Sequence, residues 1–88
     1  MHQEITIDFS EINNYSEFYS TLRKKIKFPK YFGDNLDALY DLLSGGVEMP
    51  LKIRFIHLDV DKLRKFSSLL EMMKIAEQDI QGFTFRMN

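Results

Sequence analysis

The 88 residues of this chain suffice for one domain with a single core, and 12 basic against 13 acidic side chains leave a formal net charge of −1. That charge argues against a protein that coats nucleic acid or an anionic membrane, and the absence of cysteine excludes a disulfide framework and a thiolate zinc site. The N-terminus lacks a basic start followed by an apolar run, and no segment approaches the ~20 apolar residues of a membrane span, so we expect a cytoplasmic protein.

The first part of the chain predicts a strand followed by a helix. Apolar and polar residues alternate over residues 4–9, which is typical of a β-strand. A helix should begin at Asn13 or Asn14, because a short polar side chain can cap the first turn. Its apolar spacing continues to Ile26, and Pro29 should end it.

Residues 34–44 predict a second helix. Its apolar residues recur at helical spacing and should face the core: Leu36, Leu39, Tyr40 and Leu43. Gly45 and Gly46 should then stop the helix, because glycine readily takes the left-handed conformation found at helix C-termini.

The second half predicts a strand over residues 49–58, a long helix over residues 63–78 and a last strand over residues 82–87. Apolar spacing in that helix runs through Leu63, Phe66, Leu70, Met73, and Ile75 or Glu77. Strands joined through helices favour parallel pairing and right-handed crossovers. The sequence therefore predicts an α/β fold, a three-stranded parallel sheet packed with helices, as one domain over residues 1–88.

Between residues 31 and 51 every charged side chain is acidic, whereas bases flank the segment on both sides. The acids are Asp34, Asp37, Asp41 and Glu48. In a helix the three aspartates share one flank of the apolar stripe. Asp34 suits the positive end of the helix dipole, but Asp37 and Asp41 repel each other at i, i+4 by roughly 0.2–0.5 kcal/mol. Such acids can simply keep an exposed face soluble. The lack of a basic partner at i±3 or i±4 and the presence of Tyr31 before the helix favour instead a surface that binds a cationic partner.

These residues also carry a resemblance. The run YFGDNLDALYDLL, followed by SGGVEMPL, closely resembles the barstar family, intracellular protein inhibitors of a secreted bacterial ribonuclease. The expected elements agree with that family's three-stranded parallel sheet and helices, so the resemblance covers the whole chain. It implies a barstar-like two-layer fold and a protein that is not an enzyme. It also implies an acidic helix that mimics substrate phosphates and blocks RNA access to the ribonuclease.

The resemblance assigns roles to single residues. Asp41 falls on the acid that takes the place of a substrate phosphate, and Asp37 on a second acid that meets the nuclease's basic residues. Tyr31 falls on the tyrosine that packs against the catalytic histidine. Further contact positions fall on Asn35, Tyr40, Ser44, Gly45 and Gly46.

Three positions depart from the family pattern. Tyr40 and Gly46 replace tryptophans, and the family's acidic contact on the later helix falls on Ile75, with Glu77 as a neighbour. Two interpretations therefore stay open: an inhibitor of a microbial ribonuclease, or a barstar-like binding or immunity module for a different basic protein or toxin domain. Either implies a protein partner, no nucleic acid, membrane or cofactor, and a monomer when unbound.

Other charged residues support weaker hypotheses. The basic run over residues 23–30 could contact phosphates, but no nucleic-acid signature accompanies it, and bases at a helix end also complement the dipole. Catalysis by Asp37 and Asp41 would need a water-excluding cleft. His57 has no nucleophile or carboxylate pattern around it, and Asp59 and Asp61 match no metal-ligand spacing, so they predict a polar turn.

Overall fold

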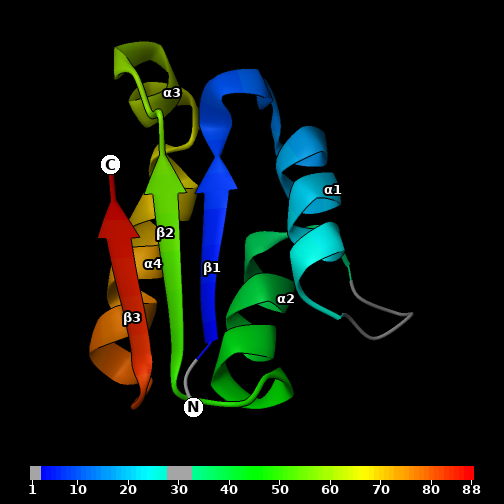
Figure 1. Ribbon diagram of the computed structural model, residues 1–88, viewed down its shortest axis with the longest axis vertical. Helices are drawn as coiled ribbons and strands as arrows, with labels where there is room; N and C mark the ends of the chain where they lie inside the picture. Colours follow the sequence, from blue (N-terminus) through cyan, green and yellow to red (C-terminus); the bar gives the residue numbers. More distant parts are fainter. Residues whose placement is uncertain (1–2, 28–32) are drawn as a thin grey trace.

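The computed structural model describes residues 3–27 and 33–88. Its sheet has three parallel strands in the order β1 (Gln3–Asp8), β2 (Leu51–Ile56), β3 (Phe83–Met87), with β2 in the centre (Figure 1). The predicted α/β fold with a three-stranded parallel sheet is confirmed. The predicted strands were slightly too long, since Phe9 belongs to a following 3₁₀ turn and Pro50 precedes β2.

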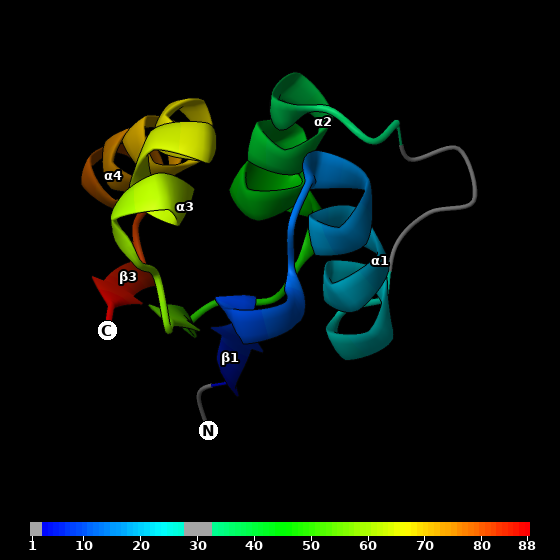
Figure 2. The ribbon, with the colours of Figure 1, turned by 90° about the horizontal axis from the view of Figure 1, so that it is seen from above.

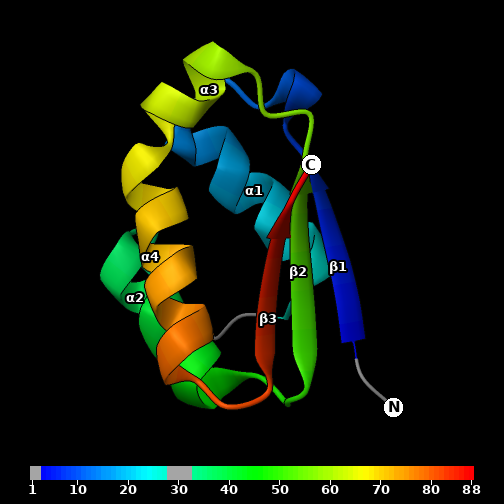
Figure 3. The same ribbon diagram turned by 90° about the vertical axis from the view of Figure 1, so that its left-hand side faces the viewer.

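The helices lie on one side of the sheet and form a second layer (Figure 3). In chain order they are the 3₁₀ turn η1 (Phe9–Glu11), α1 (Tyr15–Lys25), α2 (Leu36–Asp41), the π-helical turn η2 (Leu42–Gly46), α3 (Val60–Lys65) and α4 (Ser67–Asp79). Seen from above, α2 lies between α1 and α4 (Figure 2). None of these helices, in the described part of the chain, is long and apolar enough to cross a membrane.

The two faces of the sheet differ in polarity. Toward the helices the strands present buried apolar side chains: Ile5, Ile7, Leu51, Ile53, Phe55, Phe83 and Phe85. The opposite face carries polar side chains that are exposed or partly exposed: Thr6, Lys52, Arg54, Thr84 and Arg86. Parallel strands that are buried on both faces read as continuous apolar runs. Apolar and polar residues alternate in these strands because the helices cover only one face of the sheet.

Aromatic rings join the helices to the sheet. The fully buried ring of Phe9 lies 4.8 Å from that of Phe55 in β2, 5.1 Å from Phe66 and 5.8 Å from Phe18 in α1, between ring centroids. Phe55 also contacts Phe85 of β3, with centroids 5.0 Å apart. This aromatic cluster therefore fixes the positions of the sheet, of α1 and of the segment between α3 and α4 relative to one another.

The start of α1 is confirmed and its end is earlier than expected. Asn14 caps the helix, its Oδ1 accepting the Glu17 backbone N–H at 2.8 Å, while Glu17 Oε1 accepts the Asn13 N–H at 2.8 Å. This reciprocal pair is a capping box. The helix ends at Lys25, and Ile26 is already extended. Pro29, the expected stop, lies outside the described residues.

The single long helix predicted over residues 63–78 is wrong. Phe66, with φ −104° and ψ 22°, breaks it into α3 and α4, because its fully buried ring packs into the aromatic cluster. Phe66, Leu70 and Met73 are buried as predicted. Leu63 and Ile75, expected on the core side, are 38% and 46% exposed, and the buried stripe of α4 is Leu69, Leu70, Met73 and Ala76.

Candidate functional site

The acidic segment forms α2 because Asn35 caps it. Asn35 has an extended backbone, and its Oδ1 accepts the Ala38 backbone N–H at 2.8 Å, which satisfies one of the free donors of the first turn. Leu39 of α2 and Leu42 and Leu43 of η2 are buried in the core. The 3.6-residue period then places Asp37 and Asp41 on the opposite side, and both are exposed.

The three-aspartate flank predicted from sequence is wrong for Asp34. Since Asn35 takes the cap position, Asp34 precedes the helix and does not share its face. Its carboxylate instead pairs with the guanidinium of Arg23 in α1. The acidic face of α2 therefore consists of Asp37 and Asp41.

No described residue forms an ion pair with Asp37 or Asp41. Within residues 3–27 and 33–88 the ion pairs are Arg23 with Asp34 and Arg86 with Glu77, and the His57 ring contacts Asp8, so neither aspartate takes part in one. No base occupies the last turn of α2 or η2 either. The i, i+4 repulsion of roughly 0.2–0.5 kcal/mol therefore has no ionic compensation in the described part of the chain.

The helix ends at the two glycines, as predicted, but without the left-handed conformation that the prediction assumed. Gly45 and Gly46 continue the helix as the π-helical turn η2, neither has a positive φ, and the helix ends when Val47 becomes extended. At Gly45 an added Cβ would meet nothing within 4 Å, but at Gly46 it would lie 2.8 Å from Leu42 Cδ1. A side chain at Gly46 would therefore displace the end of the Leu42 side chain, whereas one at Gly45 would meet no neighbour.

Tyr40 connects α2 to α4. Its ring is partly buried against the core, and its hydroxyl donates a hydrogen bond to Asp79 Oδ2 at 3.2 Å. Desolvation of the hydroxyl raises the pKa of Tyr40, and the bond to Asp79 raises it further. Sequence reasoning missed Asp79, because no local pattern pairs residues that are 39 positions apart.

The remaining predicted contact residues have different surroundings. Ser44 is exposed and its hydroxyl donates to the Asp41 carbonyl at 3.1 Å. Tyr31 lies outside the described residues. On α4, Glu77 Oε2 accepts bonds from the Phe85 N–H at 2.7 Å and from Arg86 Nη1 at 2.9 Å, so this acid faces β3. The contact roles of all these residues, Asn35 included, stay predictions.

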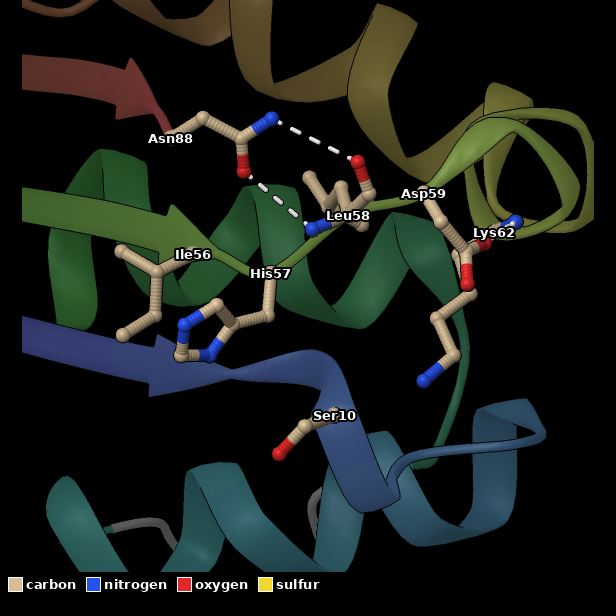
Figure 4. Close-up of a pocket in the computed structure, with 7 residues that line it drawn as sticks. All are labelled: Ser10, Ile56, His57, Leu58, Asp59, Lys62 and Asn88. Atoms are coloured by element: carbon tan, nitrogen blue, oxygen red, sulfur yellow. Dashed lines mark hydrogen bonds between the residues drawn. The ribbon is translucent and has the colours of Figure 1, made fainter.

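A cavity of about 750 Å³ opens where the strands end, away from α2 (Figure 4). Its polar side chains serve the protein itself: Asn88 bonds the backbone of Leu58, and Asp59 caps α3 through the Lys62 N–H at 2.9 Å. The Lys62 ammonium donates to the Phe9 carbonyl. These polar groups therefore bond within the protein. Asp59 lies in the polar turn that the sequence predicted, whereas Asp61 lies in the first turn of α3.

His57 borders this cavity in an unusual conformation. Its φ is +61°, in the left-handed region, and its Nδ1 lies 2.8 Å from Asp8 Oδ1. The Ser10 backbone N–H, followed by the imidazole of His57, lowers the pKa of Asp8 from 3.8 to about 2. No group of three or more potential metal-ligating His, Cys, Asp or Glu side chains occurs among the residues that the structure describes.

The fold and the acidic helix thus define an α/β protein with a surface suited to a cationic protein partner. The chain belongs to the barstar family: the family model described as "Barstar (barnase inhibitor)" matches residues 2–88. It is also 41% identical, over 51 residues, to "Putative ribonuclease inhibitor YrdF" of Bacillus subtilis (strain 168). That alignment covers 58% of this chain and 56% of the relative, so it spans little more than half of either protein.

Replacing Asn35 by alanine should lower the free energy of unfolding by about 1 kcal/mol, because the Ala38 N–H loses its acceptor. Asn35→Asp should retain the cap. Asn13→Ala is the matched control, since Asn13 contributes backbone atoms to its bonds. Urea denaturation measures all three variants, and an Asn35→Ala loss equal to that of Asn13→Ala would contradict the capping role.

The Asp8 carboxylate should add a pH-dependent contribution to stability. Because its pKa is lower in the folded protein, this contribution is complete above pH 3.8 and is lost as the pH falls to about 2. Urea denaturation of the wild type and Asp8→Asn at several pH values isolates it. The wild type's advantage should shrink over that interval, and an advantage that stays constant would show that the pKa of Asp8 is not lowered.

Proposed function

We propose that this protein inhibits a secreted bacterial ribonuclease by inserting the acidic face of α2 into the enzyme's basic active site. The observation that carries the proposal is the pair Asp37 and Asp41, exposed on one helix face without an ion-pair partner among the described residues. Membership of the barstar family and the similarity to YrdF support it. In this role the protein is an inhibitor and not an enzyme, and it acts as a cytoplasmic monomer until it meets its partner.

The mechanism is steric and electrostatic occlusion. A ribonuclease must bind a polyanion, so its active site concentrates basic side chains in one cleft. Asp41 takes the place of a substrate phosphate there, and Asp37 meets neighbouring bases, through charge-assisted hydrogen bonds that are stronger than neutral ones. Tyr31, Asn35, Tyr40, Ser44, Gly45 and Gly46 provide the surrounding contacts. RNA is excluded because the helix fills its binding site.

The same charges affect the kinetics of binding. Unpaired carboxylates on one face attract a cationic protein over a distance of about one Debye length and speed up the encounter. Once the interface closes, the desolvated pairs between carboxylates and guanidinium or ammonium groups slow dissociation. Both effects require that α2 be rigid and already folded, which the Asn35 cap and the buried leucines of α2 and η2 ensure.

A second candidate is a barstar-like module for a different basic protein or toxin domain. Two positions favour this second candidate. Gly46 has no side chain to contact a partner, and the apolar side chain of Ile75 is 46% exposed. The two candidates differ in the partner and share the surface. A panel of small secreted bacterial ribonucleases, barnase included, distinguishes them by inhibition of RNA cleavage.

Truncating Asp41 should cost more affinity than truncating any other side chain of the protein. Asp41→Ala leaves a cluster of partner cations buried and unmatched, a situation that typically costs about 3–5 kcal/mol. Calorimetric titration with a ribonuclease that the wild-type protein inhibits measures the loss of affinity. RNA cleavage by that ribonuclease should recover in parallel when the variant replaces the wild type.

The matched control is Asp61→Ala, an exposed acid in the first turn of α3. It changes the net charge equally and should leave affinity within about 0.5 kcal/mol of the wild type, as expected for a surface substitution outside the interface. Equal losses for Asp41→Ala and Asp61→Ala would contradict the assignment of α2 as the inhibitory surface. No inhibition of any ribonuclease in the panel would exclude the ribonuclease candidate.

A further inference from the structure

The outer edge of β3 has no neighbouring strand in the described part of the chain, because β2 pairs with β3 on its other side. Figure 3 looks onto this edge, and no other labelled helix or strand passes in front of it. The backbone N–H and C=O groups along such an edge can pair with a strand of another molecule. β3 begins with Phe-Thr-Phe, residues that favour strands, and it contains no proline.

The hydrogen bonds between β2 and β3 show which residues of β3 face this edge. The Leu51 N–H donates to the Gly82 carbonyl at 3.0 Å, and the Asn88 N–H donates to the Phe55 carbonyl at 2.6 Å. Gly82 and Asn88 therefore direct these backbone groups toward β2. Backbone groups of successive strand residues point alternately to the two sides of the strand. The odd-numbered residues of β3, with Phe85 in the middle, thus face the outer edge.

Side chains occupy the middle of this edge. Glu77 Oε2 of α4 accepts the Phe85 N–H at 2.7 Å. Arg86 Nη1 donates to the Phe85 carbonyl at 2.8 Å and to Glu77 Oε2 at 2.9 Å. At the start of the strand, the Phe83 N–H donates to the Ile80 carbonyl at 3.2 Å. The donor and the acceptor that Phe85 presents to the edge are therefore both bonded within the protein.

Arg86 reaches this edge from the opposite face of the sheet. Its neighbour Phe85 is buried toward the helices, so Arg86 begins on the polar outer face, directly opposite Arg54 of β2. Like charges at opposite positions of adjacent strands disfavour pairing. The Arg86 guanidinium nevertheless pairs with Glu77 on the helix side, so its side chain crosses the outer edge of β3. The ion pair thus gives Arg86 a partner that its neighbour on β2 does not provide.

The backbone of α4 does not itself cover the edge. A hollow of about 430 Å³ lies between α4 and β3, and its lining consists of Lys74, Glu77, Gln78, Phe85, Arg86 and Met87. Both members of the Glu77–Arg86 ion pair line this hollow. Their side chains therefore close the middle of an edge that the helix leaves open.

We infer that Glu77 and Arg86 close the outer edge of β3 against strand addition by a second copy of this chain. A second copy is the partner that is present wherever the protein itself is present. The same strand in two copies can pair antiparallel about a two-fold axis, which would join two sheets into one. Glu77 and Arg86 prevent this pairing because they leave Phe85 neither a free donor nor a free acceptor. The inference concerns self-association and does not rest on the proposed function.

Removing both side chains should open the edge. Glu77→Ala places a strong helix former in α4, and Arg86→Thr places a strand former in β3, so the double variant should fold. Analytical ultracentrifugation at micromolar to millimolar concentrations should show a monomeric wild type. The mass of the double variant should rise with concentration toward twice that of the monomer.

The matched control is the double variant Glu71→Ala/Arg54→Thr. It removes the same charges from exposed positions of α4 and of the outer face of the sheet, and it leaves the edge of β3 closed. We expect this control to stay monomeric over the same range of concentrations. Thermal melts followed by circular dichroism establish that both double variants are folded.

Amide hydrogen exchange tests the bond to Phe85 itself. Glu77→Ala alone should speed up exchange of the Phe85 N–H about tenfold, because that group loses a charged acceptor. Glu77→Gln retains an acceptor oxygen, so its exchange rate should stay closer to that of the wild type. In the Glu77→Ala/Arg86→Thr variant, the Phe85 N–H should become protected again at the concentrations at which the dimer forms.

A folded Glu77→Ala/Arg86→Thr variant that stays monomeric at the highest concentration would overturn the inference. Equal self-association of the control variant, or self-association of the wild type, would overturn it too. An unchanged Phe85 exchange rate in Glu77→Ala would do so even if the double variant failed to fold. None of these measurements involves a ribonuclease, so the proposed function would stand in each case.

Discussion

The rest of the structure depends on the burial of the sheet's inner face by helices on one side. Ile53 and Phe55 of the central strand are almost fully buried, and Leu39 and Leu43 pack into the same core. Helical periodicity couples this burial to the exposure of the other side of α2. A rotation that hid Asp37 or Asp41 would expose the leucines. The core therefore fixes the direction in which the acidic face points.

The charges on the helices, unlike the core, do not all follow the rules that favour stability. Where stability alone decides, the chain follows the usual rules: Asn14 and Asn35 cap their helices, and bases complete α1 and α3. The edge formed by α2 and α4 departs from these rules, because the last turns of α2, η2 and α4 contain no base and α4 ends with Asp79. Local rules that fail at one surface of a consistent fold indicate a functional site. The cationic partner that we propose would compensate these negative charges.

The sequence predicted what local periodicity determines. Alternating residues located all three strands, the caps located the start of α1, and the acid-only segment located the exposed face of α2. Sequence reasoning failed where contacts between distant residues decide. Phe66 packs into the aromatic cluster and interrupts a helical pattern. Arg23 forms an ion pair with Asp34, and Tyr40 of α2 donates a hydrogen bond to Asp79 of α4. The cap at Asn35 could have been predicted, because asparagine is among the best N-cap residues.

We propose that a cationic protein binds the acidic face of α2. A direct test follows the backbone amide chemical shifts of the isotope-labelled protein while a ribonuclease that it inhibits is added. We expect the changes to concentrate at residues 37–46, while α3 and the polar outer face of the sheet, with Arg54 and Thr84, remain unaffected. Changes that concentrate on that outer face or on α3, with α2 unchanged, would show that the partner does not bind the acidic face of α2.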